Sequence, residues 1–191
     1  MPPRPTIDAI IAAAGVLIDE AGLEGLSTRE IARRAGVSTA TFYQCFSDKR
    51  EVLKTLLGQL RAELATEGTW QLNRLATEPD WRTPVRQLIQ RTHALRVSRP
   101  GGNASRRAFH ASLEIRAWHL DGLHQLTAQL AEALLRRRPT LDPDEIRTTS
   151  TAIMMSGMAL IDLACMHPKR APAILEEAFK VAERRLAPLL D

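Results

Sequence analysis

Aromatic residues are scarce in this chain of 191 residues, which has four Phe, three Trp and a single Tyr. Cysteine is scarcer still. Cys45 and Cys165 lie far apart in the sequence, which argues against a disulfide framework or a zinc ribbon and favours a reducing compartment. No uninterrupted apolar run reaches the roughly 18 residues of a membrane span, and the N-terminus lacks the charged flank of a signal peptide. We therefore expect a cytoplasmic protein that does not enter a membrane.

Motifs of catalysis and of metal binding are also missing. The sequence contains no nucleophile elbow, no Walker loop and no dinucleotide fingerprint. His119 and His124 are too far apart for the i, i+4 pair of a zinc-binding helix, so a metal site is not expected. These absences predict a protein that is not an enzyme and has no catalytic residues, no cofactor and no metal.

Helical periodicity is what the chain does have. Apolar residues make up 45% and charged residues 25% of the sequence, which is typical of a globular domain. Nearly every segment repeats its apolar residues with a helical period, and none alternates with period two. The expected helices cover about 6–21, 28–35, 39–45, 49 onward, 83 onward, 104–138, 143–167 and 171–190, with a break at 98–103. Short helices give way to long ones near residue 65, which predicts an all-α chain with domains at 1–65 and 66–191.

Two of the short helices are separated by "GVS" and form a helix-turn-helix pattern. Ser27 and Glu30 have the spacing of a capping box, Gly36 can adopt the left-handed geometry that ends a helix, and Ser38 caps the next helix. The first 50 residues are balanced in charge, but residues 27–50 carry five basic and two acidic side chains. The positive charge is therefore concentrated around this motif.

The second helix of the motif divides its side chains between two faces. Phe42 and Phe46 lie one turn apart and are expected to anchor the helix, each stabilising the domain by roughly 1.5–3 kcal/mol. Ala40 and Gln44 lie on the opposite face, where they can meet a thymine methyl group and an adenine edge. Tyr43 lies on the flank, so that its hydroxyl group can reach a phosphate oxygen.

The neighbouring residues have simpler interpretations. Lys49, at the start of the following helix, can bind a phosphate together with the N-terminal amides of that helix. Arg33 and Arg34 are more typical of a solvated helix face, and we do not expect them to read bases. Cys45 is interpreted as a small packed side chain rather than a redox switch.

The segment "LSTREIARRAGVSTATFYQCFSDKREVL" resembles the DNA-binding region of the TetR family of bacterial transcriptional repressors. The family pattern covers residues 5 to about 60 and matches at Thr28, Ile31, Ala32, Ala35, Gly36, Val37, Ser38, Thr41, Phe42, Tyr43, Phe46 and Lys49. The resemblance implies an all-helical homodimer with an N-terminal three-helix DNA-binding domain that binds a palindromic operator. It also implies a C-terminal helical domain that binds a small-molecule effector and forms the dimer.

The resemblance further implies which residues meet the operator DNA. The residues expected at the DNA, including the capping serine Ser38, are Thr28, Arg29, Ser38, Thr39, Ala40, Thr41, Tyr43, Gln44 and Lys49. The chain departs from the family pattern at Thr39, where many members carry lysine or another long residue.

The stretch "STAIMMSGMALIDLACMH" is apolar on two faces, which predicts a helix buried on both sides. On one face small residues recur every seven positions and would permit close helix approach. We assign this face to the dimer interface, with candidate residues Ile153, Gly157, Leu160, Ile161 and Ala164.

The other face of the same stretch carries methionines and one carboxylate. Methionines pack as core filler or line adaptable pockets, and the sequence favours neither. A buried Asp162 would need a partner, either an internal arginine such as Arg116 or a ligand. The candidate ligand-binding residues are Trp118, Met155, Met158 and Asp162.

A second class of function stays open at this point. A DNA-binding interaction or architectural protein without a small-molecule effector would carry the same helix-turn-helix. The number of protected sites separates the two classes, because a regulator protects a few short palindromes whereas an architectural protein coats DNA broadly.

Overall fold

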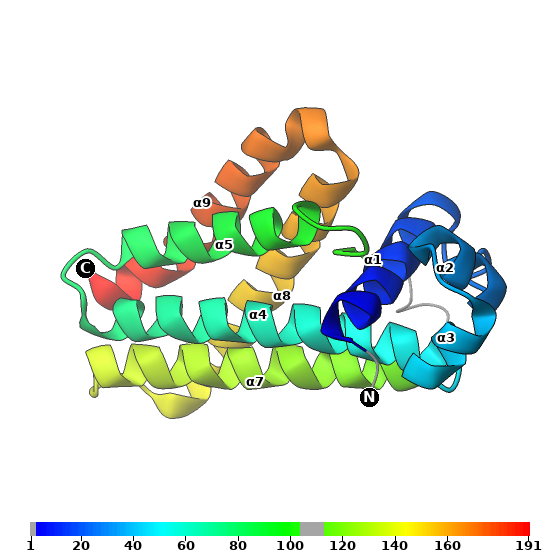
Figure 1. Ribbon diagram of the computed structural model, residues 1–191. Helices are drawn as coiled ribbons and strands as arrows, with labels where there is room; N and C mark the ends of the chain where they lie inside the picture. Colours follow the sequence, from blue (N-terminus) through cyan, green and yellow to red (C-terminus); the bar gives the residue numbers. More distant parts are fainter. Residues whose placement is uncertain (1–2, 104–112) are drawn as a thin grey trace. The chain divides into compact units, whose positions relative to one another are not determined.

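The computed structural model describes residues 3–103 and 113–191, with the backbone alone for residues 113–116, 118 and 119. Every regular element in these ranges is a helix, which confirms the expected all-α class (Figure 1). In chain order they are α1 (Arg4–Ala21), α2 (Thr28–Ala35), α3 (Thr39–Cys45), α4 (Lys49–Thr77), α5 (Arg82–Val97), α7 (Leu113–Arg137), α8 (Pro143–Met166), the 3₁₀ turn η1 (Pro168–Arg170) and α9 (Ala171–Leu190). The first part of the helix expected over 104–138 lies outside the described residues.

The chain divides into two compact units. The first contains residues 1–62 and 96–117, and the second contains residues 63–95 and 118–191. The helix α4 passes from one unit to the other without a break. The sequence predicts a single boundary near residue 65, whereas residues 96–117 group with the N-terminal unit.

A glycine turn from this second segment packs on α1. The backbone N–H of Gly101 donates to the Asp19 carboxylate at 2.7 Å. Gly101 has a φ of +74°, and a Cβ atom there would lie 2.7 Å from the Gly15 Cα and 2.9 Å from a Leu56 methyl group. On the other side, a Cβ atom at Gly15 would lie 2.5 Å from the Pro100 carbonyl oxygen. Backbone therefore meets backbone here, at a distance that only glycine permits.

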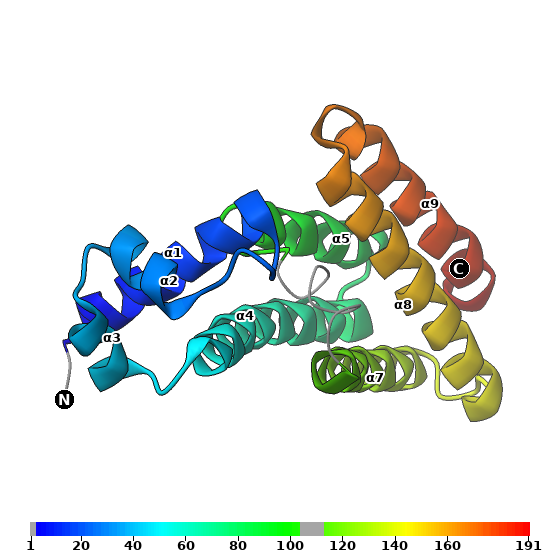
Figure 2. The same cartoon turned by 90° about the vertical axis from the view of Figure 1, so that its right-hand side faces the viewer.

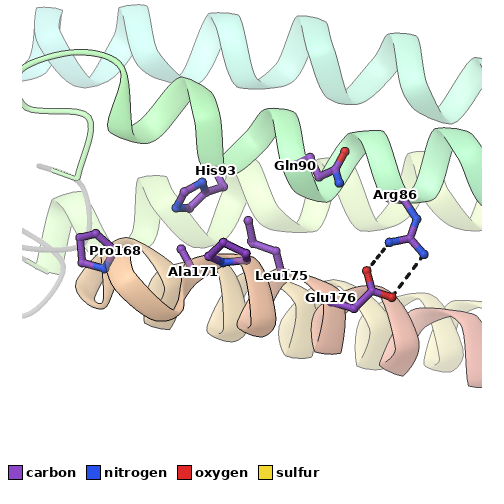
Figure 3. Close-up of a pocket in the computed structure, with 8 residues that line it drawn as sticks. Arg86, Gln90, His93, Pro168, Ala171, Leu175 and Glu176 are labelled. Carbon is purple, nitrogen blue, oxygen red and sulfur yellow. Dashed lines mark hydrogen bonds and ion pairs between the residues drawn. The ribbon is translucent and has the colours of Figure 1, made fainter.

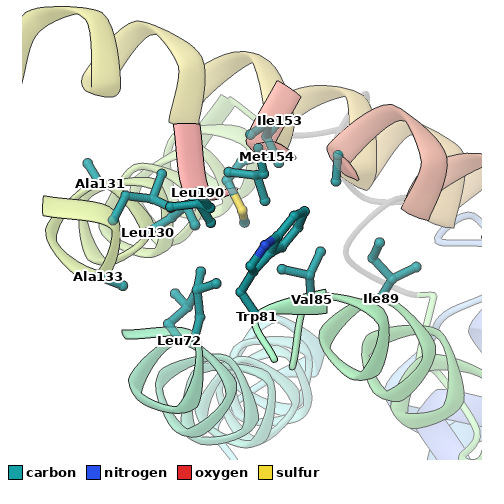
Figure 4. Close-up of a cluster of buried hydrophobic side chains, with 14 of the residues drawn as sticks. Leu72, Trp81, Val85, Ile89, Leu130, Ala131, Ala133, Ile153, Met154 and Leu190 are labelled. Atoms are coloured by element: carbon teal, nitrogen blue, oxygen red, sulfur yellow. The ribbon is translucent and has the colours of Figure 1, made fainter. Parts of the chain in front are cut away.

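The second unit has one large apolar core, to which the residue before α5, Trp81, contributes its indole ring (Figure 4). Figure 4 shows Trp81 among Leu72 of α4, Val85 of α5, Met154 of α8 and other buried side chains. Its ring nitrogen donates to the Asp191 carboxylate at 2.9 Å, so the one polar atom of the indole is satisfied. The helices α8 and α9 lie side by side against this core and are joined through η1 (Figure 2).

A polar network joins α4 to α5 within the same unit. Gln71 is almost completely buried, and its amide donates to Glu67 at 2.8 Å and accepts from Arg74 at 3.0 Å. Arg74 also donates to Gln87 of α5, and Arg91 of α5 lies 3.4 Å from the Glu67 carboxylate. A buried amide is costly unless it is hydrogen-bonded, and this network supplies its partners.

By length and composition, α8 could cross a membrane, which the sequence analysis did not expect. Only 28% of its most apolar window is buried within the structure. The core helix of a soluble protein passes the same test, and α8 packs against α9 along its length. Much of α8 is therefore exposed in a single chain.

We predict that Gly101→Ala lowers the free energy of unfolding by more than about 1 kcal/mol, because alanine is strained at this positive φ and its Cβ meets backbone. Gly58→Ala is the matched control. Gly58 lies within α4, an added Cβ there meets nothing within 4 Å, and the change should stabilise by roughly 0.5–1 kcal/mol. Urea unfolding of both variants measures the difference, and equal effects would contradict the docked turn.

Candidate nucleic-acid interface

Both short helices of the motif begin at a serine cap, as the sequence predicts. The Ser27 hydroxyl accepts from the Glu30 backbone N–H at 3.2 Å, and the Ser38 hydroxyl accepts from the Thr41 backbone N–H at 3.0 Å. Each bond satisfies one of the free amides in the first turn of a helix. The turn between them has the expected left-handed glycine, Gly36, with φ 68° and ψ 27°. The backbone N–H of Val37 then donates to the Ala32 carbonyl at 3.0 Å and closes the C-terminus of α2.

Two phenylalanines fix α3 to the core of the N-terminal unit. Phe42 is 0% exposed and Phe46 is 5% exposed, which confirms that they serve as anchors. Their ring centroids lie 6.1 Å apart, and Tyr43 packs edge-on against Phe42 at 5.5 Å. Since α3 has only seven residues, it depends on this packing for its conformation.

The opposite side of α3 is open to solvent. Thr39, Ala40, Tyr43 and Gln44 are all exposed, and their spacing places them on one side of the helix. Thr41 is half-buried, and its hydroxyl lies 2.9 Å from that of Ser38. The structure thus separates anchoring side chains from accessible ones in the way the sequence predicts.

The first turn of α2 extends this open surface. The hydroxyl groups of Thr28 and Tyr43 lie 3.5 Å apart, although the two residues are on different helices. Arg29, the next residue, is exposed, and no described side chain forms an ion pair with it. We call the half-buried Thr28 and the exposed Arg29, Thr39, Ala40, Tyr43 and Gln44 the α2–α3 face.

The other arginines of α2 are engaged within the unit. Arg33 pairs with Glu30 of its own helix, and its hydrogen bond to that carboxylate lowers the pKa of Glu30. Arg34 pairs with Glu20 of α1. Both pairs agree with the interpretation of these arginines as residues of a solvated face.

The start of α4 differs from the sequence expectation. The Asp48 carboxylate accepts from the backbone N–H groups of Arg50 and Glu51 at 2.8 and 2.9 Å, so these amides are already bonded within the chain. Lys49 donates to the Leu26 carbonyl at 2.7 Å. The ammonium group of Lys49 keeps two further N–H donors for a phosphate. The sequence expectation that the N-terminal amides of α4 bind the same phosphate is wrong for Arg50 and Glu51, because the Asp48 carboxylate accepts from both.

Glu51 adds a second bond at the same turn. Its carboxylate accepts from the backbone N–H of Ser47 at 2.6 Å and from the Ser47 hydroxyl at 2.8 Å. The backbone bond and then the hydroxyl bond lower the pKa of Glu51. Ser47 and Asp48 of the loop between α3 and α4 are therefore both bonded to the first turn of α4.

Most of the candidate dimer residues on α8 are buried within a single chain and not on its surface. Ile153 and Ile161 belong to the apolar core of the second unit, and Ala164 is fully buried beside α9. Leu160 is partly buried against the same core, while an added Cβ at Gly157 would meet nothing within 4 Å. Because three of the five side chains are already buried within one chain, they have almost no area left for a partner.

The candidate ligand residues on α8 do not share one buried face. Met155 is 50% exposed rather than buried, Met158 packs on the core, and Asp162 is half-buried. The side chain of Trp118 lies outside the described residues, as does that of Arg116. Both faces of α8 are apolar, so periodicity alone cannot tell which one packs inward.

A cavity that the sequence pattern does not predict lies between α5 and α9 in the second unit. Arg86, Gln90 and His93 of α5 line one side of it. Their i, i+4, i+7 spacing places three polar residues on one side of the helix, and this signal was available in the sequence.

Comparisons with known proteins agree on one family. Residues 10–56 match the family model described as bacterial regulatory proteins, tetR family. This N-terminal segment is similar to the DNA-binding region of TetR-family regulators. The fold of the chain is similar to that of a solved TetR-family transcriptional regulator.

Three relatives illustrate the extent of this likeness. The tetracycline repressor protein class A from transposon 1721 of Escherichia coli is 37% identical over 76 residues, which is 40% of this chain. The HTH-type transcriptional repressor DrrR1 of Streptomyces coeruleorubidus is 32% identical over 95 residues, or 49% of this chain. These matches span 33% of the length of each relative. A TetR-family transcriptional regulator from Streptomyces coelicolor has a TM-score of 0.63 and 25% identity, covering 97% of this chain and 99% of its own.

We predict opposite consequences for two adjacent aromatic residues of α3. Phe42→Ala should lower the free energy of unfolding by about 3–5 kcal/mol, because it leaves a cavity at a fully buried site. Tyr43→Ala, at a site that is 55% exposed, should cost no more than about 1 kcal/mol. Urea unfolding followed by circular dichroism measures both, and a larger loss for Tyr43→Ala would refute the orientation of α3.

Proposed function

We propose that this protein is a cytoplasmic, sequence-specific transcriptional repressor that binds a palindromic operator as a homodimer and is released by a small molecule. The single observation that carries the proposal is the α2–α3 face, an exposed polar surface on a short helix whose opposite side is fixed by two buried phenylalanines. An α-helix of this kind fits the major groove of B-DNA.

The side chains of the α2–α3 face divide into two roles. Gln44 can form a bidentate contact with adenine, and Ala40 can pack on a thymine methyl group. Tyr43 and Thr28 carry neighbouring hydroxyl groups at the edge of the face, where they suit one phosphate group. Arg29 adds positive charge beside them, and Thr39 adds a short polar side chain in place of the lysine common in the family.

The dimer interface is proposed on the exposed side of α8. Ala152, Met155, Ala159, Leu163 and Met166 are all exposed, lie three or four residues apart and carry no charge. We call them the α8 stripe. Spacing of this kind produces a continuous apolar seam along a helix, which a second copy of α8 can cover. A two-fold dimer presents two recognition helices, and they enter successive major grooves when they are about 34–36 Å apart.

Release by an effector follows from the same requirement on spacing. A ligand that binds better when the recognition helices are further apart shifts the population away from the DNA-binding form. The alternative is an architectural DNA-binding protein without an effector. Footprinting separates the two, since protection of a few short palindromes supports the repressor and broad coating of DNA supports the alternative.

We predict that two substitutions on the α2–α3 face affect DNA binding differently. Tyr43→Phe removes a phosphate contact and should weaken binding about equally on all sequences. Gln44→Ala should relax the preference at one base pair in each half-site, with a loss of roughly 1–3 kcal/mol of discrimination. Electrophoretic mobility shifts on a panel of single-base operator variants measure both effects. Uniform weakening by Gln44→Ala would show that this side chain does not read a base.

We also predict that Met155→Glu converts the dimer into monomers. In a two-fold interface each substituted side chain meets the partner's α8, so buried like charges repel across the seam. Trp70→Glu is the control, because Trp70 is also 50% exposed but lies on α4. Sedimentation equilibrium gives the mass of each variant, and a dimer of unchanged stability for Met155→Glu would place the interface elsewhere.

A further inference from the structure

The second unit contains a cavity of about 440 Å³ between α5 and the N-terminal half of α9 (Figure 3). This volume lies within the range of about 300–1,000 Å³ that small-molecule sites occupy. It is lined by Arg86, Gln90, His93, Pro168, Ala171, Pro172, Leu175 and Glu176. None of these residues belongs to the α2–α3 face or the α8 stripe.

The cavity has a charged end and an end that is apolar on its α9 side. In Figure 3, Arg86 and Glu176 lie together at the charged end, and Pro168 and Ala171 lie at the other end opposite His93 of α5, with Leu175 between the two ends. Arg86 and His93 are seven positions apart on α5, which corresponds to about 10 Å along a helix. A ligand that fills this space therefore has a charged head and an apolar chain of medium length.

Arg86 is held in place independently of its carboxylate partner. Its guanidinium lies 3.8 Å from the centroid of the Phe179 ring, and Phe179 belongs to the buried core of the unit. Stacking on a fixed aromatic ring keeps the planar group oriented. Arg86 therefore presents its N–H donors to the cavity whichever acceptor occupies them.

Glu176 is the exchangeable member of the pair. Its side chain is 44% exposed, and its carboxylate oxygens accept from both terminal nitrogens of Arg86. An ion pair this open to solvent is weak, so another carboxylate can replace Glu176 at low cost. A cationic ligand is disfavoured, because the guanidinium of Arg86 stays stacked on Phe179 beside the cavity and repels it.

We propose that this cavity binds a small amphipathic carboxylate, whose head group replaces Glu176 on Arg86 and whose chain lies along Leu175 and Ala171. The proposal names the effector class of the proposed repressor and in that respect rests on the proposed function. A route to the DNA-binding unit exists along the chain, since α5 ends at Val97 and leads directly into the turn at Gly101 that packs on α1.

Isothermal titration calorimetry of the full chain with sodium octanoate tests the site without DNA. We expect one octanoate per chain, with 1-octanol and octyltrimethylammonium binding at least about tenfold more weakly, because octanol offers Arg86 only a neutral acceptor and the quaternary ammonium offers none. Arg86→Gln should weaken octanoate binding by about tenfold or more, since one charge-assisted contact is lost. Arg91→Gln is the matched control on the same helix, because Arg91 faces Glu67 and does not line the cavity.

Glu176→Gln should change octanoate affinity in the opposite direction to Arg86→Gln. It removes the competing carboxylate, and octanoate should bind about threefold or more tightly. Thermal melts of all variants check folding. If Arg86→Gln is unstable, the sign of the Glu176→Gln effect decides alone. Equal binding of octanol, equal effects of Arg86→Gln and Arg91→Gln, or unchanged or weaker binding to Glu176→Gln would each overturn the proposal.

Operator binding is measured separately, so that the two proposals can fail independently. Octanoate should release the parent protein from its operator, and Arg86→Gln should resist release. Octanoate binding without release would retain the site and overturn its role as an effector site. A protein that binds octanoate but no DNA would overturn the proposed function and leave the site in place.

Discussion

A helix of seven residues is not stable in water, and α3 has seven residues. Its conformation comes from the burial of Phe42 and Phe46 on one side and from the Ser38 cap at its start. This packing determines which side chains remain outside. Tyr43 and Gln44 are accessible because their neighbours are buried, so the core of the N-terminal unit and the proposed DNA-reading surface depend on the same contacts.

The sequence predicts the helices of the N-terminal unit well, because the residues that start, end and orient them act on their near neighbours in the chain. Serine caps and a left-handed glycine each act within a few residues, and the phenylalanine spacing distinguishes the two sides of one short helix. The docking of the Gly101 turn on α1 is different. It joins residues that are 82 positions apart, and a proline–glycine sequence predicts a turn but not what the turn packs against.

The faces of α8 show a second limit of sequence patterns. Ile153 and Met155 are both apolar, yet one is buried and the other is half-exposed. Small residues at a regular spacing suggested close approach to another helix, and α8 does have such a neighbour in α9 of the same chain. A pattern of this kind cannot distinguish an internal neighbour from a partner copy. The same reasoning applies to Lys49, whose bond to the Leu26 carbonyl depends on how distant backbone segments meet.

The contact between Gly15 and the Pro100–Gly101 peptide has a consequence for how sequences related to this one can diverge. The atoms that would meet a new side chain at position 15 are a carbonyl carbon and oxygen, which every amino acid carries. A change at position 100 or 101 therefore cannot make room for it, and no compensating pair of substitutions is available. Loss of either glycine requires the whole turn to move, and the two positions are fixed together by backbone geometry rather than by side-chain chemistry.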